Sequence, residues 1–215
     1  MPTQELESAV VTFLDVLGWK GIYGRHEDPL GSIASLLNDL QRLSEQAGRG
    51  VGTVGLPTKV ISISDTIVLY TACEGAHVSE ALKIQGRLCC HAVPASIRSS
   101  IPMRGATSYG QAAVADGGAV YMGPAVDEAA AWHEQGNWIG VHLTPSAQFS
   151  AGPDHDGWVK YDVPLKTGGK LSTLVADWAM EVPTAMSHFA QMAPILPATV
   201  AKYTNTISFL ERPGP

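Results

Sequence analysis

The stretch Ala9-Val10-Val11-Thr12-Phe13-Leu14-Asp15-Val16-Leu17 is a nearly continuous apolar run that only Thr12 and Asp15 interrupt. Such a run is typical of a strand buried on both faces, so we predict a central strand over residues 9–17 with Asp15 at its end. A carboxylate among so many apolar neighbours is costly unless a metal or a basic partner compensates it, which favours a functional role. The alternative is that Asp15 caps the next helix or pairs with a basic residue.

A helix and a hairpin are predicted after this strand. Asp28-Pro29 provides an N-cap followed by proline at the first helical position, and leucine and isoleucine then recur at helical spacing until Gly48. Two β-branched runs, 58–64 and 66–71, are separated only by the turn. They predict a hairpin with Asp65 exposed near its tip, where an aspartate is ordinary.

The middle of the chain continues the alternation of helices and strands. Apolar positions at helical spacing over 77–93 predict a second helix, which we expect Pro94 to stop. Two further strands are predicted over 102–114 and 119–122. A third helix follows over 123–136, opened by a Gly-Pro pair. The resulting order, β-α-ββ-α-ββ-α, is an α+β pattern with a mostly antiparallel sheet flanked by helices.

The last third of the chain is less regular. Strands are predicted over 138–143 and 171–180, joined by a stretch rich in Gly, Pro and Asp that we expect to be loop. Residues 183–210 are helical by composition, although Pro194 and Pro197 must break or kink that segment. We therefore expect a C-terminal helical extension.

Composition restricts the class of protein. The 215 residues suit one domain, and 45% hydrophobic with 16% charged residues is ordinary for a globular chain. The net charge is −6 and the 14 Lys and Arg residues are scattered, which argues against nucleic acid as the main ligand. No stretch reaches the roughly 18 apolar residues that would span a bilayer, so we expect a cytoplasmic protein without a membrane partner. Three cysteines, two of them adjacent, indicate reduced core thiols.

Asp15 and Asp65 are candidate metal ligands as a pair. Mg²⁺ and Mn²⁺ bind through a few carboxylates while substrate phosphates and waters complete the coordination, and two aspartates at facing strand ends would supply those carboxylates. Leu17-Gly18-Trp19-Lys20 follows Asp15 as a short turn whose backbone N–H groups and lysine could meet a triphosphate. The alternative for Lys20 is a solvated loop lysine.

Four motifs in order resemble those of class III nucleotide cyclases. Phe13-Leu14-Asp15-Val16-Leu17-Gly18-Trp19 resembles the first metal motif of that family, and Ile63-Ser64-Asp65-Thr66 resembles the second. The strand motif 103–110 and the strand-helix motif 120–130 resemble the elements that follow. The matches span roughly residues 8 to 140.

The resemblance implies a fold and a site. The fold would be a ferredoxin-like or palm-like cyclase domain occupying 1–215, with a core of about 8–180 and a helical segment of about 183–210. Two divalent ions, Mn²⁺ or Mg²⁺, would be cofactors, and a head-to-tail homodimer would form composite sites. The implied site residues are the metal ligands Asp15, Val16 and Asp65, the catalytic Asp15, Asp65 and Arg104, and the substrate-binding Leu17, Gly18, Trp19, Lys20 and Tyr109. Arg104 could instead be a surface arginine, and Tyr109 could pack in the core or at an interface.

Departures from the family pattern are informative. The lysine and aspartate that read purine bases fall on Ile61 and Val120, and the asparagine and arginine that stabilise the transition state fall on Asp127 and Ala131. These losses suit either a degenerate, non-catalytic homologue or a divergent branch with another base. Both metal aspartates are intact, which favours the divergent branch.

The subfamily resemblance is to the pyrimidine cyclases of bacterial Pycsar antiphage systems. The opening of the first motif, the 104–106 strand and the ending over 203–210 are similar to theirs. This implies synthesis of cyclic UMP from UTP, or cyclic CMP from CTP, upon infection, as a signal for a separate effector protein. Two other functions stay open, a catalytically inactive nucleotide-binding regulatory module and a metal-dependent nuclease or polymerase-like enzyme.

Three further signals are given structural interpretations. The pattern Gly50–Gly55 matches a dinucleotide fingerprint but follows a helix and enters a strand, so we expect a loop. Asp154-His155-Asp156-Gly157 lacks the later glutamate of a calcium loop and is expected to be a turn. His133-Glu134 is expected to be a solvated helix face.

Overall fold

The computed structural model describes residues 6–47, 55–115, 120–192 and 195–212. The elements in chain order are β1 (Glu7–Val16), a short 3-10 turn, α1 (Pro29–Ala47), β2 (Thr58–Ile63), β3 (Thr66–Ala72), a second 3-10 turn, α2 (Val78–Arg98), β4 (Met103–Ala115), β5 (Val120–Met122), α3 (Pro124–Trp132), β6 (Val141–Leu143), α4 (Pro145–Ser150), β7 (Trp158–Pro164), β8 (Lys170–Ala176), α5 (Val182–Gln191) and α6 (Pro197–Leu210).

Strand β1 is central, as its apolar sequence predicts. The sheet order is β2-β3-β1-β4-β6-β8-β7, with β5 paired to β4. Among the described strands, all pairings are antiparallel except that of β4 with β6. The mostly antiparallel α+β architecture flanked by helices is therefore confirmed.

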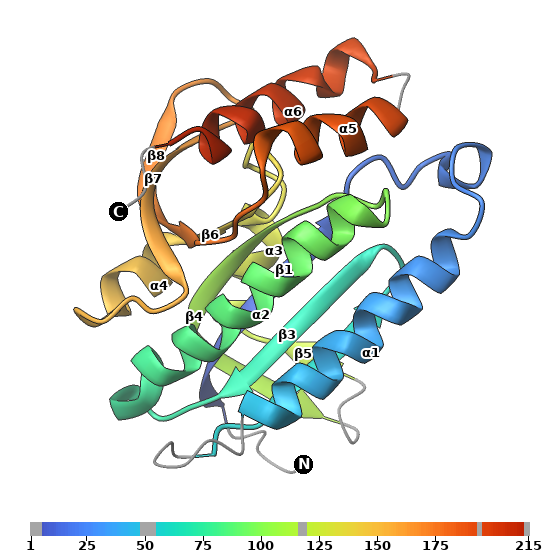
Figure 1. Cartoon of the computed structure of the whole chain (residues 1–215). Helices are drawn as coiled ribbons and strands as arrows, with labels where there is room; N and C mark the ends of the chain where they lie inside the picture. The colour runs from blue at the N-terminus through green and yellow to red at the C-terminus, as the bar shows by residue number, and fades with distance from the viewer. Residues whose placement is uncertain (1–5, 48–54, 116–119, 193–194, 213–215) are drawn as a thin grey trace.

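The two faces of β1 are covered by different helices. Its even-numbered residues, such as Val10 and Leu14, belong to the large core beneath α1 and α2. Its odd-numbered residues, such as Val11 and Phe13, face α3, which packs on β1 and β4 from the other side. Figure 1 shows α1 and α2 in front of the sheet and α3 behind it. Because strand residues alternate between faces, Asp15 lies on the α3 side.

A buried polar network fixes α2 against the strands. The Gln85 side chain is fully buried, and its amide nitrogen donates to the Val10 carbonyl at 2.7 Å and to the Thr71 hydroxyl at 3.0 Å. Its amide oxygen accepts from the Thr12 hydroxyl, which lies 2.6 Å from the Thr107 hydroxyl. One helix residue thereby ties β1, β3 and β4 together, which sets the register that places Asp15.

Several predicted boundaries hold. Asp28 caps α1, since its carboxylate accepts the Gly31 N–H at 2.9 Å. The β2–β3 hairpin turns at Ser64-Asp65 as predicted. The C-terminal segment breaks into α5 and α6, with Pro197 opening α6. Pro194 and residues 50–54 of the glycine pattern lie outside the described residues.

Two predictions about secondary structure are wrong. Pro94 does not stop α2, which continues to Arg98 because two residues beyond the proline, Ser96 and Ile97, are completely buried and hold that turn in place. The stretch between β6 and β8 is not simply loop, because it contains α4 and β7. Strand β7 alternates polar and apolar residues and pairs along its length with β8, so its pattern was that of a strand at the sheet edge.

The C-terminal helices lie across one end of the sheet (Figure 1). The α6 residue Phe209 packs against Trp138 and Trp178, with ring centroids 4.8 Å and 5.5 Å away. The Thr206 hydroxyl accepts the Ile139 N–H at 2.8 Å. These contacts make the C-terminal extension part of the domain core.

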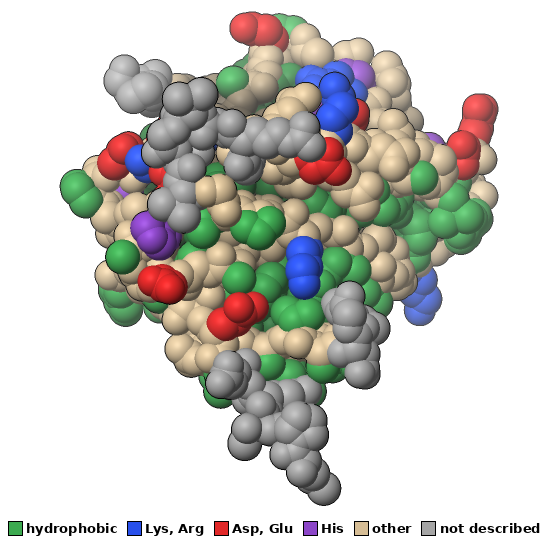
Figure 2. All heavy atoms as spheres, turned by 90° about the horizontal axis from the view of Figure 1, so that it is seen from below, with side chains coloured by type: hydrophobic (Ala, Val, Ile, Leu, Met, Phe, Trp, Pro, Cys, Tyr) green, Lys and Arg blue, Asp and Glu red, His purple; other side chains and the backbone are tan. Residues whose placement is uncertain are grey.

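The helices, the surface charges and the cysteines can be compared with the composition. In the part of the chain that the structure describes, no helix is both long and apolar enough to cross a bilayer. Figure 2 shows the face opposite the C-terminal helices, where the visible basic side chains are scattered among acidic ones. Cys73, Cys89 and Cys90 are free thiols, and burial raises the pKa of Cys73 to about 11, which keeps it protonated at neutral pH.

Candidate functional site

The predicted site residues gather where β1 ends. This end of the sheet also holds the β2–β3 turn and the start of β4, because Asp15 is paired with Thr66 on one side and with Arg104 on the other. The α3 helix ends beside the same position. The segments involved are far apart in the sequence, and the strand register alone brings them together.

Asp15 is a nearly buried carboxylate, with 8% of the residue exposed. Burial raises the pKa of Asp15 above its ordinary value, although the positive charges of Arg104 and His133 act to lower it. Arg104 donates to the Asp15 carboxylate, with Nη2 and Oδ2 3.3 Å apart. The ion pair with Arg104 therefore does not fully offset the cost of burying the Asp15 charge, and a further cation would stabilise the ionised carboxylate.

Asp65 lies in the hairpin turn immediately beside the end of β1. Its carbonyl accepts the Val16 N–H at 3.1 Å, and Ser64 before it adopts a φ of 59°, which is uncommon outside glycine. The charge of Asp65 is one of the causes that raise the pKa of Asp15. The two aspartates thus share one end of the sheet and influence each other electrostatically.

Arg104 is held between two carboxylates. Besides Asp15, its guanidinium lies 3.5 Å from the Glu134 carboxylate, and Nη1 donates to the Glu134 carbonyl at 3.0 Å. Only 5% of Arg104 is exposed, so its alternative interpretation as a surface arginine is wrong. Burial alone would raise the pKa of Glu134, but Arg104 and Lys166 hold it below its ordinary value.

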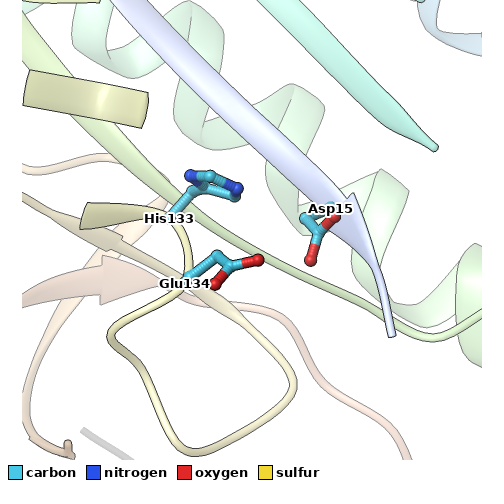
Figure 3. A group of neighbouring side chains, drawn as sticks. All are labelled: Asp15, His133 and Glu134. Atoms are coloured by element: carbon cyan, nitrogen blue, oxygen red, sulfur yellow. The ribbon is translucent and has the colours of Figure 1, made fainter. Parts of the chain in front are cut away.

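His133 and Glu134 belong to the surroundings of Asp15, which the sequence reasoning missed. Figure 3 shows both side chains at the end of α3 beside the Asp15 carboxylate. One potential ligand atom from each of the three residues lies within 4.8 Å of the others. The His133 ring also packs on Phe13, with centroids 5.8 Å apart. The expectation of a solvated helix face was wrong for His133, whose ring contacts Phe13. The sequence held one sign of this contact, because His133 follows the buried Ala125 and Ala129 at intervals of one helical turn.

The turn after β1 has the character of an anion-binding loop. Gly18 and Gly21 adopt left-handed φ values of 72° and 82°. Leu17 is buried and its N–H donates to the Pro102 carbonyl at 2.8 Å. None of the hydrogen bonds among the described residues uses the N–H groups of Gly18, Lys20 or Gly21. These donors remain available, as they are in loops that bind phosphate.

Two of the predicted substrate-binding residues have packing roles. Trp19 packs against the core and meets Tyr23 edge-on at 6.2 Å. Tyr109 lies five residues beyond Arg104 on β4, on the opposite face, and packs against the core under α2. The structure therefore does not bring Tyr109 to the site of its own chain, and its contacts are those of a partly buried residue beside the core.

The positions that depart from the family pattern are mostly solvent-facing. Asp127 and Ala131 are exposed on α3, Val120 is exposed on β5, and Ile61 is half-buried on β2. Because Asp127 and Ala131 face away from Asp15, neither contributes to the site of the same chain.

The residues present suit a hard divalent cation. Carboxylates from Asp15 and Asp65 are oxygen donors of the kind that Mg²⁺ and Mn²⁺ prefer. The raised pKa of Asp15 shows that the positive charge available from Arg104 does not fully compensate its burial. Arg104 lies between Asp15 and Glu134, so a cation bound at Asp15 would share that carboxylate with the guanidinium.

Comparison with solved structures shows the fold. The chain is similar to the catalytic core of a rhodopsin-guanylyl cyclase with converted specificity in complex with ATPαS, at 18% identity and a TM-score of 0.59, covering 82% of this chain and 98% of the other. It is also similar to the guanylate cyclase domain of RhGC from Catenaria anguillulae in complex with GTP, at 17% identity and a TM-score of 0.56, covering 80% and 97%. Adenylate cyclases from Trypanosoma brucei match at 13% identity and a TM-score of 0.51, covering 80% and 90%.

Sequence comparison adds nothing to this, since no protein-family model and no curated protein matches the chain. The chain therefore has the class III cyclase fold, as the motifs predicted.

Proposed function

We propose that this chain is a nucleotide cyclase that converts UTP to 3′,5′-cyclic UMP and pyrophosphate. The observation that carries the proposal is the convergence of Asp15 and Asp65 at one end of the sheet, beside a loop with free backbone N–H groups. The class III cyclase fold supports it, and several of its solved examples are named as guanylyl or adenylate cyclases.

The chemistry requires the ribose 3′-oxygen to attack the α-phosphorus. The bond from that phosphorus to the bridging oxygen of the β-phosphate breaks, pyrophosphate leaves, and the hydroxyl proton is lost. Two divalent ions held by the Asp15 and Asp65 carboxylates and the Val16 carbonyl would activate the hydroxyl and offset charge on the triphosphate.

The other residues of the site would bind the triphosphate and orient the Asp15 carboxylate. In the loop Leu17–Lys20, the unused N–H groups of Gly18 and Lys20 would donate to phosphate oxygens, with the Lys20 side chain as an additional cation. Arg104 would hold the Asp15 carboxylate ionised and in place while adding positive charge near the reacting phosphoryl group. The His133 ring and Glu134 border this arrangement on the α3 side.

Two lines of reasoning support a pyrimidine substrate. The positions where purine cyclases carry a base-reading lysine and aspartate hold Ile61 and Val120, neither of which can pair with a purine edge. The resemblance to the Pycsar pyrimidine cyclases favours UTP, with CTP as the alternative. In that setting the product would accumulate upon phage infection and bind a separate effector protein.

The test is to incubate the purified protein with Mn²⁺ and each of the four ribonucleoside triphosphates, and to identify the products by mass. We expect cyclic UMP and an equal amount of pyrophosphate from UTP. Cyclic CMP alone would move the assignment to cytidylate cyclase. No consumption of any triphosphate would refute the proposal.

A homodimer is part of the proposal. Asp127 and Ala131 are exposed on α3, and by the family resemblance this surface would face the site of a partner copy. Sedimentation should give twice the chain mass, and activity per chain should fall upon dilution below the dissociation constant. A monomer with undiminished activity at all concentrations would contradict a composite site.

A second candidate is a regulatory homologue that binds nucleotide without turnover. The exposed Asp127 and Ala131 favour it, because they lack the amide and the cation that the family places there. Calorimetry would then show UTP binding in the same preparation that yields no product. Any turnover would eliminate it.

A further inference from the structure

A cavity separates the loop after β1 from the C-terminal helix α6. Its volume is about 330 Å³, within the range of small-ligand sites. The loop contributes Gly18, Lys20 and Gly21, and α6 contributes Lys202 and Tyr203. In Figure 1 the loop that follows β1 passes beside the α5–α6 pair, which agrees with this shared lining.

Lys202 is a buried ammonium group on this lining. Only 7% of the residue is exposed, and within the described residues its Nζ makes no hydrogen bond or ion pair. Burial lowers the pKa of Lys202, and the positive charges of Arg104 and Lys166 lower it further, while Glu134 acts in the opposite direction. A buried cation among other cations is costly unless an anion joins it.

The remaining charge on the cavity is also positive. Lys20 and Arg25 contribute to the lining, and no described lining residue is acidic, although the chain as a whole carries a net charge of −6. The unused N–H groups of Gly18, Lys20 and Gly21 belong to the same loop. Three cations and a set of backbone donors around one cavity are the chemistry that binds a polyphosphate.

We propose that this cavity is the polyphosphate subsite and that Lys202 binds the β- and γ-phosphates from within the same chain. The inference rests on the proposed cyclase function for its substrate. It gives the C-terminal extension a direct role in substrate binding. Helix α6 would supply a cation, which Asp127 and Ala131 on α3 do not provide. Lys202 would then be a substrate-binding residue.

The test uses inorganic tripolyphosphate as the probe, titrated into the full chain by calorimetry without divalent ions, so that the carboxylate site takes no part. The variants are Lys202→Met, Lys20→Gln and the control Lys160→Met, which removes an exposed lysine of β7 outside this cavity. We expect Lys202→Met to weaken binding about tenfold or more, Lys20→Gln to weaken it severalfold, and Lys160→Met to match the wild type.

Folding of the variants is controlled within the same experiment. Lys202→Met removes a buried charge and keeps the length of the side chain, so its thermal unfolding temperature should be at least that of the wild type. Lys20 is exposed, so Lys20→Gln tests the cavity without touching the core. Wild-type affinity in both variants, or no tripolyphosphate binding by the wild type, would overturn the inference.

Failure of this inference is distinguishable from failure of the proposed function. Tripolyphosphate binding that depends on Lys202 in a protein without turnover would support the subsite and refute the cyclase. Turnover of UTP with unchanged kcat and KM in Lys202→Met would support the cyclase and refute the subsite.

Discussion

At the scale of single residues, the environment of Asp15 is the feature that most needs a functional explanation. The carboxylate is nearly buried at the end of the central strand, and its single guanidinium partner is shared with Glu134. An arrangement selected only for stability would have placed an apolar residue here, since replacing buried ion pairs by apolar residues is often neutral or stabilising. The cost is understandable if the carboxylate binds a cation.

Asp15→Asn and Asp65→Asn should each lower the rate of UTP turnover by about 100-fold or more, because the amide keeps the size of the carboxylate but removes the charge that holds the metal. The measurement is product formation under saturating Mn²⁺. Asp39→Asn is the matched control, since Asp39 lies on the exposed face of α1 in a surface pair with Arg42. Equal activity in Asp65→Asn and Asp39→Asn would exclude a metal-binding role for Asp65.

Arg104→Met should destabilise the metal-free protein by about 3 kcal/mol, because it leaves Asp15 and Glu134 near each other without the cation between them. Added Mn²⁺ should recover much of that loss, so its effect on Tm should be larger in the variant than in the wild type. Differential scanning calorimetry measures both quantities. Arg42→Met, at an exposed surface pair, should show neither effect. An equal Mn²⁺ response in Arg104→Met and wild type would contradict this electrostatic interpretation.

Among the helices and strands, those marked by a pattern of a few consecutive residues were predictable from the sequence. The apolar run of β1 and the β-branched runs of the hairpin were sufficient to place Asp15 and Asp65 at strand ends, because strand period and turn residues act over a few positions. The continuation of α2 past Pro94 was not predictable in this way, since it depends on tertiary burial of Ser96 and Ile97. Propensity is a weak prior where packing opposes it.

The same distinction applies to the site. The positions of His133 beside Asp15 and of Lys202 on the adjoining cavity were not predicted, because they depend on which helix face meets the sheet. Lys202, Thr206 and Phe209 are all buried on α6, at helical spacing. That spacing was visible in the sequence and could have indicated a lysine on a buried face. The partner of that face, the loop after β1, could not have been inferred without the fold.

The Gln85 side chain holds helix α2 against strands β1 and β3 through buried hydrogen bonds. Gln85→Met should therefore lower the free energy of unfolding by about 2–4 kcal/mol. The substitution leaves the hydroxyls of Thr12 and Thr71 and the Val10 carbonyl without their amide partner in the core. Urea denaturation measures the difference. Gln41→Met, on the exposed side of α1, should change stability by less than about 0.5 kcal/mol. Similar values for the two variants would show that the network does not stabilise the fold.

At the scale of the whole molecule, the fold brings distant segments to one end of the sheet and leaves the opposite face without a concentration of charge (Figure 2). The loop after β1, the hairpin turn, the end of α3 and the helix α6 all meet near Asp15 or the adjoining cavity. The C-terminal helices are anchored there by the aromatic contacts of Phe209. The extension is therefore positioned to act in the site and not only to cover the core.

The stability of the whole domain should fall in mild acid through His142. This residue is fully buried on β6, and burial lowers its pKa from the ordinary 6.5 to about 4. The unfolded chain therefore binds a proton more readily, so this contribution to stability is present above pH 6.5 and is lost as the pH falls towards 4. The loss amounts to about 3 kcal/mol.

His142→Leu isolates that contribution. Chemical denaturation of the wild type and the variant at pH 7 and at pH 4.5 should show a smaller acid-induced loss in the variant. Parallel losses in the two proteins would mean that His142 is protonated equally well in the folded and unfolded chains.

Anomalous diffraction would show whether carboxylates from two distant strands bind divalent cations around a triphosphate. The crystals would contain Mn²⁺ and a UTP analogue with a methylene group between the α- and β-phosphorus atoms. We expect manganese peaks in contact with carboxylate oxygens of both Asp15 and Asp65 and with the phosphates. Manganese bound to Asp15, His133 and Glu134 without Asp65, or bound away from Asp15 altogether, would contradict this expectation.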